Sequence, residues 1–276
     1  IAVTYIPQAS PAGLADCVRT AREFLGDDDF LMYLGDNMLR DGVRSLVDEF
    51  VSEPVAAQIL TVRVPEPQRF GVVEMDADRV VRVVEKPDDP PSDLALAGVY
   101  LFSPQVHEII SQLRPSARGE YEITDAIQGL IDEGLEVRAH EVTGWWKDTG
   151  QPEDLLEANR LVLSSIEPWI EGSVEGAEVI GPVQVAAGAQ VKGGRLIGPC
   201  VIGPGTLCED AVIGPDVALG SSCRVSGATV EDSIVMDGCE IADANLTRSL
   251  LGRSVIVRGV GSAHLVVGDH GQVTLP

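Results

Sequence analysis

The sequence predicts an α/β domain followed by a parallel β-helix, and two observations support that prediction. Over residues 1–168, apolar strand-like segments alternate with segments of helical spacing, which is typical of an α/β sheet with helices on both faces. From about Gly172 the helical period disappears and apolar residues recur at every sixth position, which is typical of a parallel β-helix. We therefore place the two domains at residues 1–168 and 169–276.

Composition narrows the functional classes before any motif is considered. The 276 residues are 45% hydrophobic, which excludes general disorder, and no apolar run is long enough to cross a bilayer. The net charge of −23 repels nucleic acid and anionic membranes, so we expect neither as a partner. None of the five cysteines forms a C-x-x-C pair, which favours free thiols in a reducing cytoplasm over zinc sites or disulfides.

Strand and helix signals alternate through the first domain. Residues 14–25 have helical spacing, and the apolar run of residues 29–37 ends in a Gly-Asp-Asn turn, as a buried strand would. We also expect helices over residues 42–53, near 121–134 and over 152–165, and strands over 1–6, 55–64 and near 135–143. Because ligands of such sheets bind at the carboxyl ends of the strands, the turns that follow strands are the places to look for chemistry.

The second domain carries an imperfect six-residue repeat. The repeat is clearest in two runs: Val179, Val185 and Val191, and then Ile213, Leu219 and Val225. Ile-Gly-Pro begins at residues 180, 197, 202 and 213, and each step is one residue short of a multiple of six. We therefore expect roughly five coils over residues 172–268, with Gly and Pro at irregular corners. A sandwich of short strands is the alternative.

Two aspartates follow strand-like segments and are candidate metal ligands. Asp36 lies in the segment LGDNML after a buried strand, and Asp148 lies in GWWKDTGQ at a strand-to-helix turn. Two such turns place two carboxylates across one crevice, and two carboxylates with phosphate oxygens and waters make a typical Mg²⁺ site. The plainer interpretation is that each aspartate only caps a turn, and the residues alone leave both interpretations open.

Three further segments offer ligand-binding groups. Glu85 and Lys86 end an apolar strand, where a carboxylate can accept sugar hydroxyls and an ammonium can bind phosphate. Gln8 can both donate to and accept from the edge of a base, while Gly13 lets the backbone approach a flat ring. Gly71 follows Arg-Phe at the start of a strand and has no side chain to exclude a sugar. The plainer interpretations are a surface ion pair, a helix-entry loop and a hairpin glycine.

Taken in order, these motifs resemble those of the glucose-1-phosphate thymidylyltransferases, in the long form that carries a left-handed β-helix tail. The matching segments are QASPAGLA, FLMYLGDN, QRFGVVEMD, VEKP, AGVYLFS, GEYEITDAI and GWWKDTGQPEDLLEAN. The resemblance covers nearly the whole chain. It implies a Rossmann-like nucleotidyltransferase domain that couples glucose 1-phosphate to dTTP and releases pyrophosphate.

The resemblance also implies a role for each candidate residue. In-line attack on the α-phosphorus, without a covalent enzyme intermediate, would need positioning and charge neutralisation. The implied catalytic residues are Asp36 and Lys86. The implied binding residues are Gln8 and Gly13 for thymine, Gly71 and Glu85 for the sugar, Lys86 for its phosphate, Trp146 for the substrate, and Asp36 and Asp148 for Mg²⁺. The plainer interpretation of Trp146 is a core tryptophan.

The main departure from the family pattern lies at the front of the chain. Family members begin with a strand and a glycine-rich G-G-x-G-T-R-L loop that clamps the triphosphate, and this sequence contains no such loop. We therefore expect a truncated catalytic domain in which residues 1–6 are an internal strand. We also predict that this chain alone is inactive, because losing one strong cation at a phosphoryl transition state costs roughly 10³–10⁵ in rate.

Three alternative functions stay open at this point. The first is another sugar-1-phosphate nucleotidyltransferase that uses UTP. The second is an acyltransferase, although the absence of histidine from residues 141–263 counts against it. The third is a non-catalytic assembly or regulatory module, in which the β-helix packs against the catalytic domain or against a neighbouring subunit of a homo-oligomer.

Overall fold

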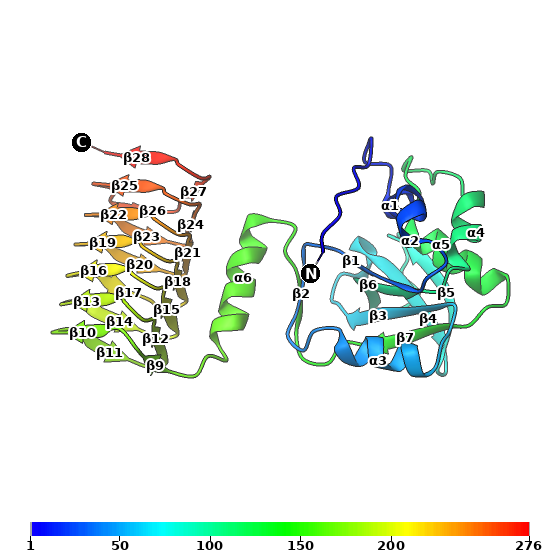
Figure 1. The fold of residues 1–276 in the computed structure, drawn as a ribbon, viewed down its shortest axis with the longest axis horizontal. Coiled ribbons are helices and arrows are strands. Elements are labelled where there is room, and N and C mark those ends of the chain that lie inside the picture. Colours follow the sequence, from blue (N-terminus) through cyan, green and yellow to red (C-terminus); the bar gives the residue numbers. More distant parts are fainter. Residues whose placement is uncertain (1, 276) are drawn as a thin grey trace. The chain divides into compact units, whose positions relative to one another are not determined.

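The computed structural model describes residues 2–275 and divides into two compact units, Ile1–Asp148 and Thr149–Pro276 (Figure 1). The first unit is an α/β domain, and the second is a β-solenoid preceded by helix α6 (Pro152–Leu163). The sequence-based boundary at residue 168 places α6 with the first domain. In the second unit, α6 is bonded to the solenoid by Arg160, whose Nε and Nη2 each donate to Asp232 at 2.7 Å.

A six-stranded mixed sheet forms the centre of the first unit. Its order is β5–β4–β6–β3–β7, and β1 also pairs with β6. The bounds are β1 (Phe30–Tyr33), β3 (Ala57–Arg63), β4 (Gly71–Asp76), β5 (Arg79–Glu85), β6 (Leu94–Phe102) and β7 (Val137–Glu141). Only β3 and β7 pair in parallel, and the other pairs are antiparallel. All nine residues of β6 are buried, because neighbouring strands flank it on both sides.

Helices cover both faces of this sheet, as the alternating pattern predicts. The helices are α1 (Leu14–Thr20), α2 (Arg22–Leu25), α3 (Arg44–Ser52), α4 (Val106–Gln112), α5 (Ile123–Asp132) and the 3₁₀ turn η1 (Pro67–Arg69). Tyr100 and Phe102 of β6 belong to an apolar cluster with residues of α1, α4 and α5. Val99 and Leu101 belong to a second cluster, with Leu46 and Phe50 of α3. Successive side chains of β6 therefore face opposite layers of helices.

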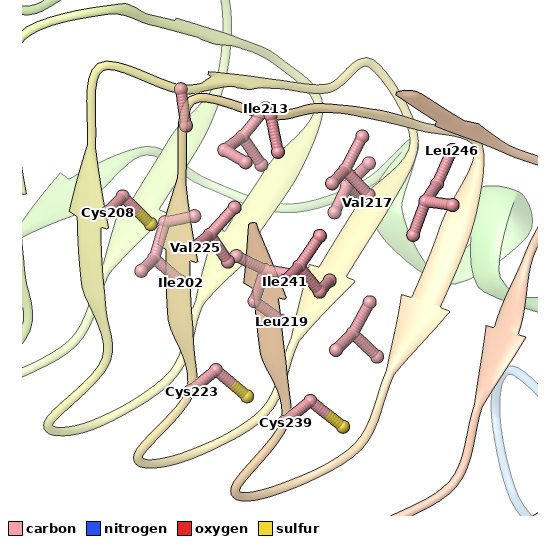
Figure 2. Packing of buried hydrophobic residues seen from close by; sticks show 14 of the residues in the cluster. Ile202, Cys208, Ile213, Val217, Leu219, Cys223, Val225, Cys239, Ile241 and Leu246 are labelled. Atoms are coloured by element: carbon pink, nitrogen blue, oxygen red, sulfur yellow. The ribbon is translucent and has the colours of Figure 1, made fainter. Parts of the chain in front are cut away.

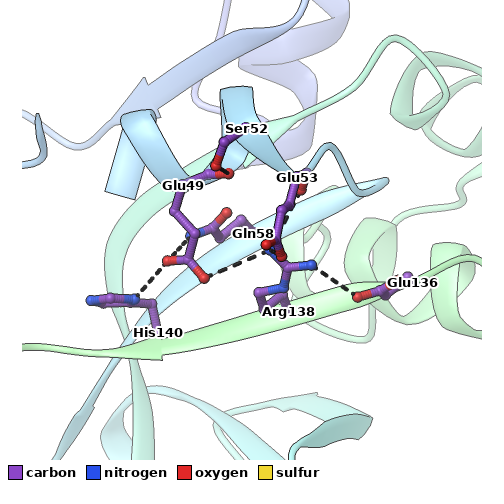
Figure 3. A network of polar contacts seen from close by, with 7 residues as sticks. All are labelled: Glu49, Ser52, Glu53, Gln58, Glu136, Arg138 and His140. Carbon is purple, nitrogen blue, oxygen red and sulfur yellow. Dashed lines mark hydrogen bonds and ion pairs between the residues drawn. The ribbon is translucent and has the colours of Figure 1, made fainter. Parts of the chain in front are cut away.

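A polar network fixes α3 to strands β3 and β7 (Figure 3). Glu49 accepts a 3.0 Å hydrogen bond from Gln58 Nε2, and His140 Nδ1 lies 3.1 Å from the same carboxylate oxygen. Arg138 lies 3.6 Å from Glu49 and 3.3 Å from Glu136. Because Gln58 is fully buried, the bond from its Nε2 satisfies a polar group that would otherwise destabilise the layer.

Residues 2–6 do not form the strand that their alternation predicts. They have no regular secondary structure, and their side chains are exposed, with Val3 67% and Tyr5 91% accessible. The first residue of the expected strand lies outside the described residues. Apolar alternation favours a strand only where a neighbouring strand supplies hydrogen bonds, and residues 2–6 pair with no described strand.

Three parallel sheets form the solenoid, and their strands stack coil upon coil (Figure 1). One sheet contains β10 (Ser173–Glu175), β13 (Gln190–Lys192), β16 (Leu207–Glu209), β19 (Arg224–Ser226), β22 (Glu240–Ala242), β25 (Ile256–Arg258) and β28 (Gln272–Thr274). The second contains β11 (Glu178–Ile180), β14 (Arg195–Ile197), β17 (Val212–Ile213), β20 (Thr229–Glu231), β23 (Asn245–Thr247) and β26 (Ser262–Ala263). The third contains β9 (Trp169–Ile170), β12 (Val183–Val185), β15 (Cys200–Ile202), β18 (Val217–Leu219), β21 (Ser233–Val235), β24 (Leu250–Leu251) and β27 (Val266–Val267).

The strand register explains why the six-residue repeat is imperfect. Val191 pairs with Cys208, and Cys208 with Val225, so each of these coils takes 17 residues. Val225 pairs with Ile241, and Ile241 with Val257, so later coils take 16. A coil of three complete hexapeptides would take 18, so the corners lose one or two residues. The solenoid has about six coils rather than the five expected, because its strands extend beyond residues 172–268.

The repeated apolar residues fill the solenoid interior, as predicted (Figure 2). Ile213, Leu219 and Val225 are at most 2% exposed. Val179 differs, with 40% exposure, because it lies in the first coil and stacks against only the following coil. All five cysteines are free, and four of them are buried in this interior. Burial raises the pKa of the Cys200 and Cys208 thiols to about 12, which suits their role as small apolar residues.

Candidate functional site

A pocket of about 180 Å³ in the first unit collects most of the candidate residues. Of the sequence-predicted residues, Gly71, Glu85, Lys86, Trp146 and Asp148 line it. Gln8, Gly13 and Asp36 are not among the lining residues, although Leu14 and Asn37, the chain neighbours of Gly13 and Asp36, are. A larger hollow of about 620 Å³, lined by residues 78–80, 131 and 134–139, contains none of the candidates. The chemistry of the side chains therefore favours the smaller pocket.

Two short strands bring the candidate metal ligands to one end of this pocket. Strand β2 (Asn37–Leu39) pairs antiparallel with β8 (Trp146–Asp148), and Asn37 lies directly opposite Asp148. Asp36 precedes Asn37, so the two aspartates occupy adjoining backbone positions although they are 112 positions apart in sequence. This is the placement that the two strand-ending turns predict.

Trp146 positions the turn that carries Asp36. Its Nε1 donates to Asn37 Oδ1 at 2.6 Å and to the carbonyl oxygen of Ala97 at 3.1 Å. Asn37 Nδ2 in turn donates to Asp36 Oδ1 at 2.9 Å. Gly98 is required beneath this turn, because a Cβ there would lie 2.7 Å from Asn37 Nδ2. Trp146 thus both lines the pocket and orders a candidate metal ligand.

Gly71 and Glu85 face each other across the β4–β5 pair. They are direct partners in the register, and a Cβ on Gly71 would lie 2.7 Å from Thr124 Cγ2 and 3.3 Å from Glu85 Oε2. Gly71 is buried against Thr124 and Leu96, so only glycine fits at this wall of the pocket. The space above it is bounded by a carboxylate that can accept hydrogen bonds from hydroxyl groups.

The Glu85 carboxylate is held by a cluster of side chains. Arg118 Nη1 donates to its Oε1 at 3.1 Å, and Thr124 Oγ1 donates to its Oε2 at 3.3 Å. Lys86 Nζ lies 3.9 Å from Oε1, and the Lys86 side chain is 44% exposed. Burial, followed by repulsion from Glu122, raises the pKa of Glu85, while Lys86, Arg118 and Thr124 oppose that rise. The result is a fixed acceptor beside an accessible cation.

Gln8 and Gly13 lie in one loop that leads into α1. Gln8 Nε2 donates to Asp16 Oδ2 at 2.6 Å. Gly13 has a φ of +105°, and a Cβ there would lie 2.5 Å from the carbonyl oxygen of Tyr121. Glycine is therefore needed at position 13 to pack the loop against the backbone of Tyr121, independently of any contact with a ligand.

Sequence reasoning missed three residues that organise the site. Arg118 and Asn37 hold Glu85 and Asp36 respectively, and the buried Asp16 holds Gln8. Arg118 and Asn37 lie in or beside segments that carry the family resemblance, which is the only signal that could have indicated them. The contacts of Arg118 with Glu85 and of Asn37 with Trp146 join distant parts of the chain, so no local period reveals them.

Comparisons with known proteins show what this chain is similar to. The profile of the family described as "Nucleotidyl transferase" matches residues 1–165. The glucose-1-phosphate thymidylyltransferases of Streptomyces griseus and of Streptomyces antibioticus are each 47% identical, over 99% of this chain and 79% of their own length. A crystal structure from Bacillus anthracis, assigned as a glucose-1-phosphate thymidylyltransferase in complex with a sucrose, superposes with a TM-score of 0.52. The superposed region is 36% identical in sequence and covers 57% of this chain and 64% of the Bacillus anthracis chain.

Proposed function

Because this chain belongs to the nucleotidyl transferase family, we propose that its pocket serves the transfer of a thymidylyl group from dTTP to glucose 1-phosphate. The products are dTDP-glucose and pyrophosphate. The observation that carries the proposal is the grouping of Gly71, Glu85 and Lys86 on one pocket. A wall without a side chain, a fixed carboxylate and a cation are what a hydroxylated ring with a phosphate needs. The free thiols suit the reducing cytoplasm, where we place the reaction.

In this proposal Glu85 and Lys86 position the sugar phosphate. The Glu85 carboxylate accepts sugar hydroxyls above Gly71, and Arg118 with Thr124 keeps that carboxylate in one orientation. The Lys86 ammonium neutralises the sugar phosphate. One oxygen of that phosphate attacks the α-phosphorus of dTTP, a new P–O bond forms, and the bond to the leaving pyrophosphate breaks. Positioning and charge neutralisation supply the catalysis, since no covalent intermediate is needed.

The donor set at the β2–β8 pair fits a magnesium ion. Asp36 and Asp148 offer hard oxygen ligands in adjoining positions, which Mg²⁺ prefers. Among the residues that the structure describes, no group of three or more His, Cys, Asp or Glu side chains could form a complete protein cage. A site of two carboxylates suits an ion that keeps waters and substrate phosphates as its other ligands. When bound there, Mg²⁺ would offset negative charge on the phosphate oxygens.

Ligand titration tests the proposed function on the chain itself. We expect calorimetry to detect binding of glucose 1-phosphate and of dTDP-glucose, with UDP-glucose binding more weakly. Failure of dTDP-glucose to bind would overturn the proposal, whether or not glucose 1-phosphate binds. Tighter binding of UDP-glucose would favour the UTP-dependent alternative.

A turnover assay addresses the separate prediction of inactivity. The sequence contains no glycine-rich loop to clamp the triphosphate, so we expect no measurable dTDP-glucose when dTTP, glucose 1-phosphate and Mg²⁺ are supplied to this chain. Chromatographic detection of dTDP-glucose would overturn the prediction of inactivity and would support the proposed reaction.

A further inference from the structure

A buried carboxylate fixes the orientation of the Gln8 side-chain amide. Gln8 Nε2 donates to Asp16 Oδ2 at 2.6 Å and lies 3.4 Å from the carbonyl oxygen of Gly13. Asp16 is only 7% exposed. An ionised carboxylate accepts hydrogen bonds and cannot donate them, so the amide nitrogen, not the amide oxygen, must face Asp16. The Cys17 Sγ donates to Gln8 Oε1 at 3.4 Å, which agrees with that orientation.

Asp16 is itself held in place and kept ionised. The Arg19 guanidinium forms an ion pair with it and lies 4.3 Å above the ring centroid of Tyr121. Tyr121 also accepts a backbone hydrogen bond from Ala15, which secures the start of α1. The hydrogen bond from Gln8, together with Arg19, lowers the pKa of Asp16 despite its burial. The Asp16 carboxylate is therefore a fixed acceptor rather than a side chain that can rotate away.

The consequence is a defined hydrogen-bonding character at Gln8. Both N–H groups of its amide face protein acceptors, Asp16 and Gly13. Its Oε1 has two lone pairs, and a thiol is only a weak donor to one of them. What Gln8 can still offer a ligand is therefore an acceptor and not a donor.

A hydrogen-bond acceptor at Gln8 discriminates among pyrimidine bases. Thymine and uracil carry a hydrogen-bond donor at N3, whereas the N3 of cytosine is an acceptor. We propose that Asp16 is a positioning residue for base specificity, which holds Gln8 so that its carbonyl oxygen selects 2,4-dioxopyrimidines over cytosine. The inference rests on the proposed function, because it takes Gln8 as the group that meets the base.

The test is the ratio of two affinities in an Asp16→Asn variant. An amide at position 16 can face Gln8 with either its oxygen or its nitrogen, so the Gln8 amide is free to reverse. We expect the preference of the chain for dTDP-glucose over dCDP-glucose to fall roughly tenfold, the cost of a mismatched buried donor or acceptor. The ratio of dTDP-glucose to UDP-glucose and the affinity for glucose 1-phosphate should not change, because neither depends on the orientation of Gln8.

The chain supplies a matched control in a second Gln–Asp pair. Gln128 Nε2 donates to Asp132 Oδ1 at 2.8 Å, and both residues belong to α5. Asp132→Asn removes the same charge from the same kind of hydrogen bond, and we expect it to leave the preference for dTDP-glucose over dCDP-glucose unchanged.

A double variant distinguishes orientation from structural damage. In Gln8→Glu with Asp16→Asn, the new amide donates to the new carboxylate, and position 8 again offers an acceptor. We expect this exchange to restore most of the lost preference. An unchanged preference in Asp16→Asn, or a double variant that binds glucose 1-phosphate without regaining the preference, would overturn the role of Asp16. A wild-type chain that binds neither nucleotide sugar would overturn the proposed function itself, and this inference with it.

Discussion

The two units of this protein encode their structures in different ways. In the solenoid, interior residues recur every 16 or 17 positions, and each coil contacts the coil before and after it. In the first unit, the pocket gathers side chains from β2, β4, β5, β6 and β8, and none of these positions follows from a period. A repeated pattern therefore specifies the solenoid, while individual long-range contacts specify the site.

This difference separates stability from function along the chain. Changes in a solenoid column should alter folding and leave ligand binding alone, because every residue of the pocket lies in the first unit. Changes at the pocket should alter binding more than folding. The predictions that follow test this separation, from the largest expected effect to the smallest.

The largest effect is expected in the solenoid interior. Ile213 is fully buried, so Ile213→Ala removes packed methyl groups and leaves a cavity. We expect a loss of about 2–5 kcal/mol in the free energy of unfolding, measured by urea denaturation. Binding of glucose 1-phosphate, measured where the variant is still folded, should be unchanged. A parallel loss of binding would contradict the separation of the two units.

A substitution at the pocket wall should affect both the stability of the protein and its binding of glucose 1-phosphate. The added Cβ of Gly71→Ala meets Thr124 and Leu96 at 2.7 and 2.9 Å, so we expect a loss of about 1–3 kcal/mol in stability. We also expect roughly tenfold weaker binding of glucose 1-phosphate, because Glu85 must shift. The control is Gly261→Ala, where nothing lies within 4 Å of the new Cβ and stability should change by less than about 0.5 kcal/mol. Equal behaviour of the two variants would argue against a tight wall at Gly71.

Removal of the pocket cation should affect binding alone. Lys86→Ala eliminates the ammonium that we assign to the sugar phosphate, and we expect roughly tenfold weaker binding of glucose 1-phosphate by calorimetry. Lys192 is a matched control, because it lies in the solenoid with a similar exposure, 48% against 44%. We expect Lys192→Ala to bind as the wild type does. Equal losses in both variants would indicate a general effect of charge rather than a phosphate site.

The smallest effect is a pH dependence that comes from Glu85. Its pKa is raised above the ordinary value of 4.5, first by burial and then by Glu122. Between the ordinary and the raised pKa the folded chain holds a proton that the unfolded chain does not. The stability contributed by this group therefore increases as the pH falls through that window and is lost as the pH rises.

Binding should show the opposite dependence on pH. A protonated Glu85 is a poorer acceptor for sugar hydroxyls, so the affinity for glucose 1-phosphate should fall roughly threefold as the pH is lowered through the same window. Calorimetric titrations of wild type and of Glu85→Gln at each pH isolate this effect, since the phosphate of the ligand titrates equally in both. A constant ratio of the two affinities would exclude an ionised Glu85 as the sugar acceptor.

Local patterns predicted the architecture well and the site only in part. The alternation of segments indicated helices on both faces of a sheet, and the six-residue spacing placed Ile213, Leu219 and Val225 in the solenoid interior. The alternation of residues 2–6 was misleading, because a strand also needs a partner. The number of coils was underestimated because the solenoid strands extend beyond residues 172–268. The left-handed sense of the solenoid stays a prediction.

The candidate site depended on the family resemblance for a physical reason. The bond between Arg118 and Glu85 joins residues 33 positions apart, and the bond between Trp146 and Asn37 joins residues 109 apart. Such contacts follow from the folded topology and leave no spacing to detect. The Gln8–Asp16 pair is closer in sequence, but its effect on the orientation of Gln8 depends on the burial of Asp16, which cannot be read from the sequence.

The most direct test of the account is a crystal structure of this chain soaked with dTDP-glucose. We predict that the glucosyl ring lies against Gly71 and the Glu85 carboxylate, with the adjoining phosphate at Lys86 and the thymine at Gln8. A nucleotide sugar bound in the larger hollow beside residues 134–139, or with its sugar away from Glu85, would contradict the central claim that this pocket is a thymidylyltransferase site.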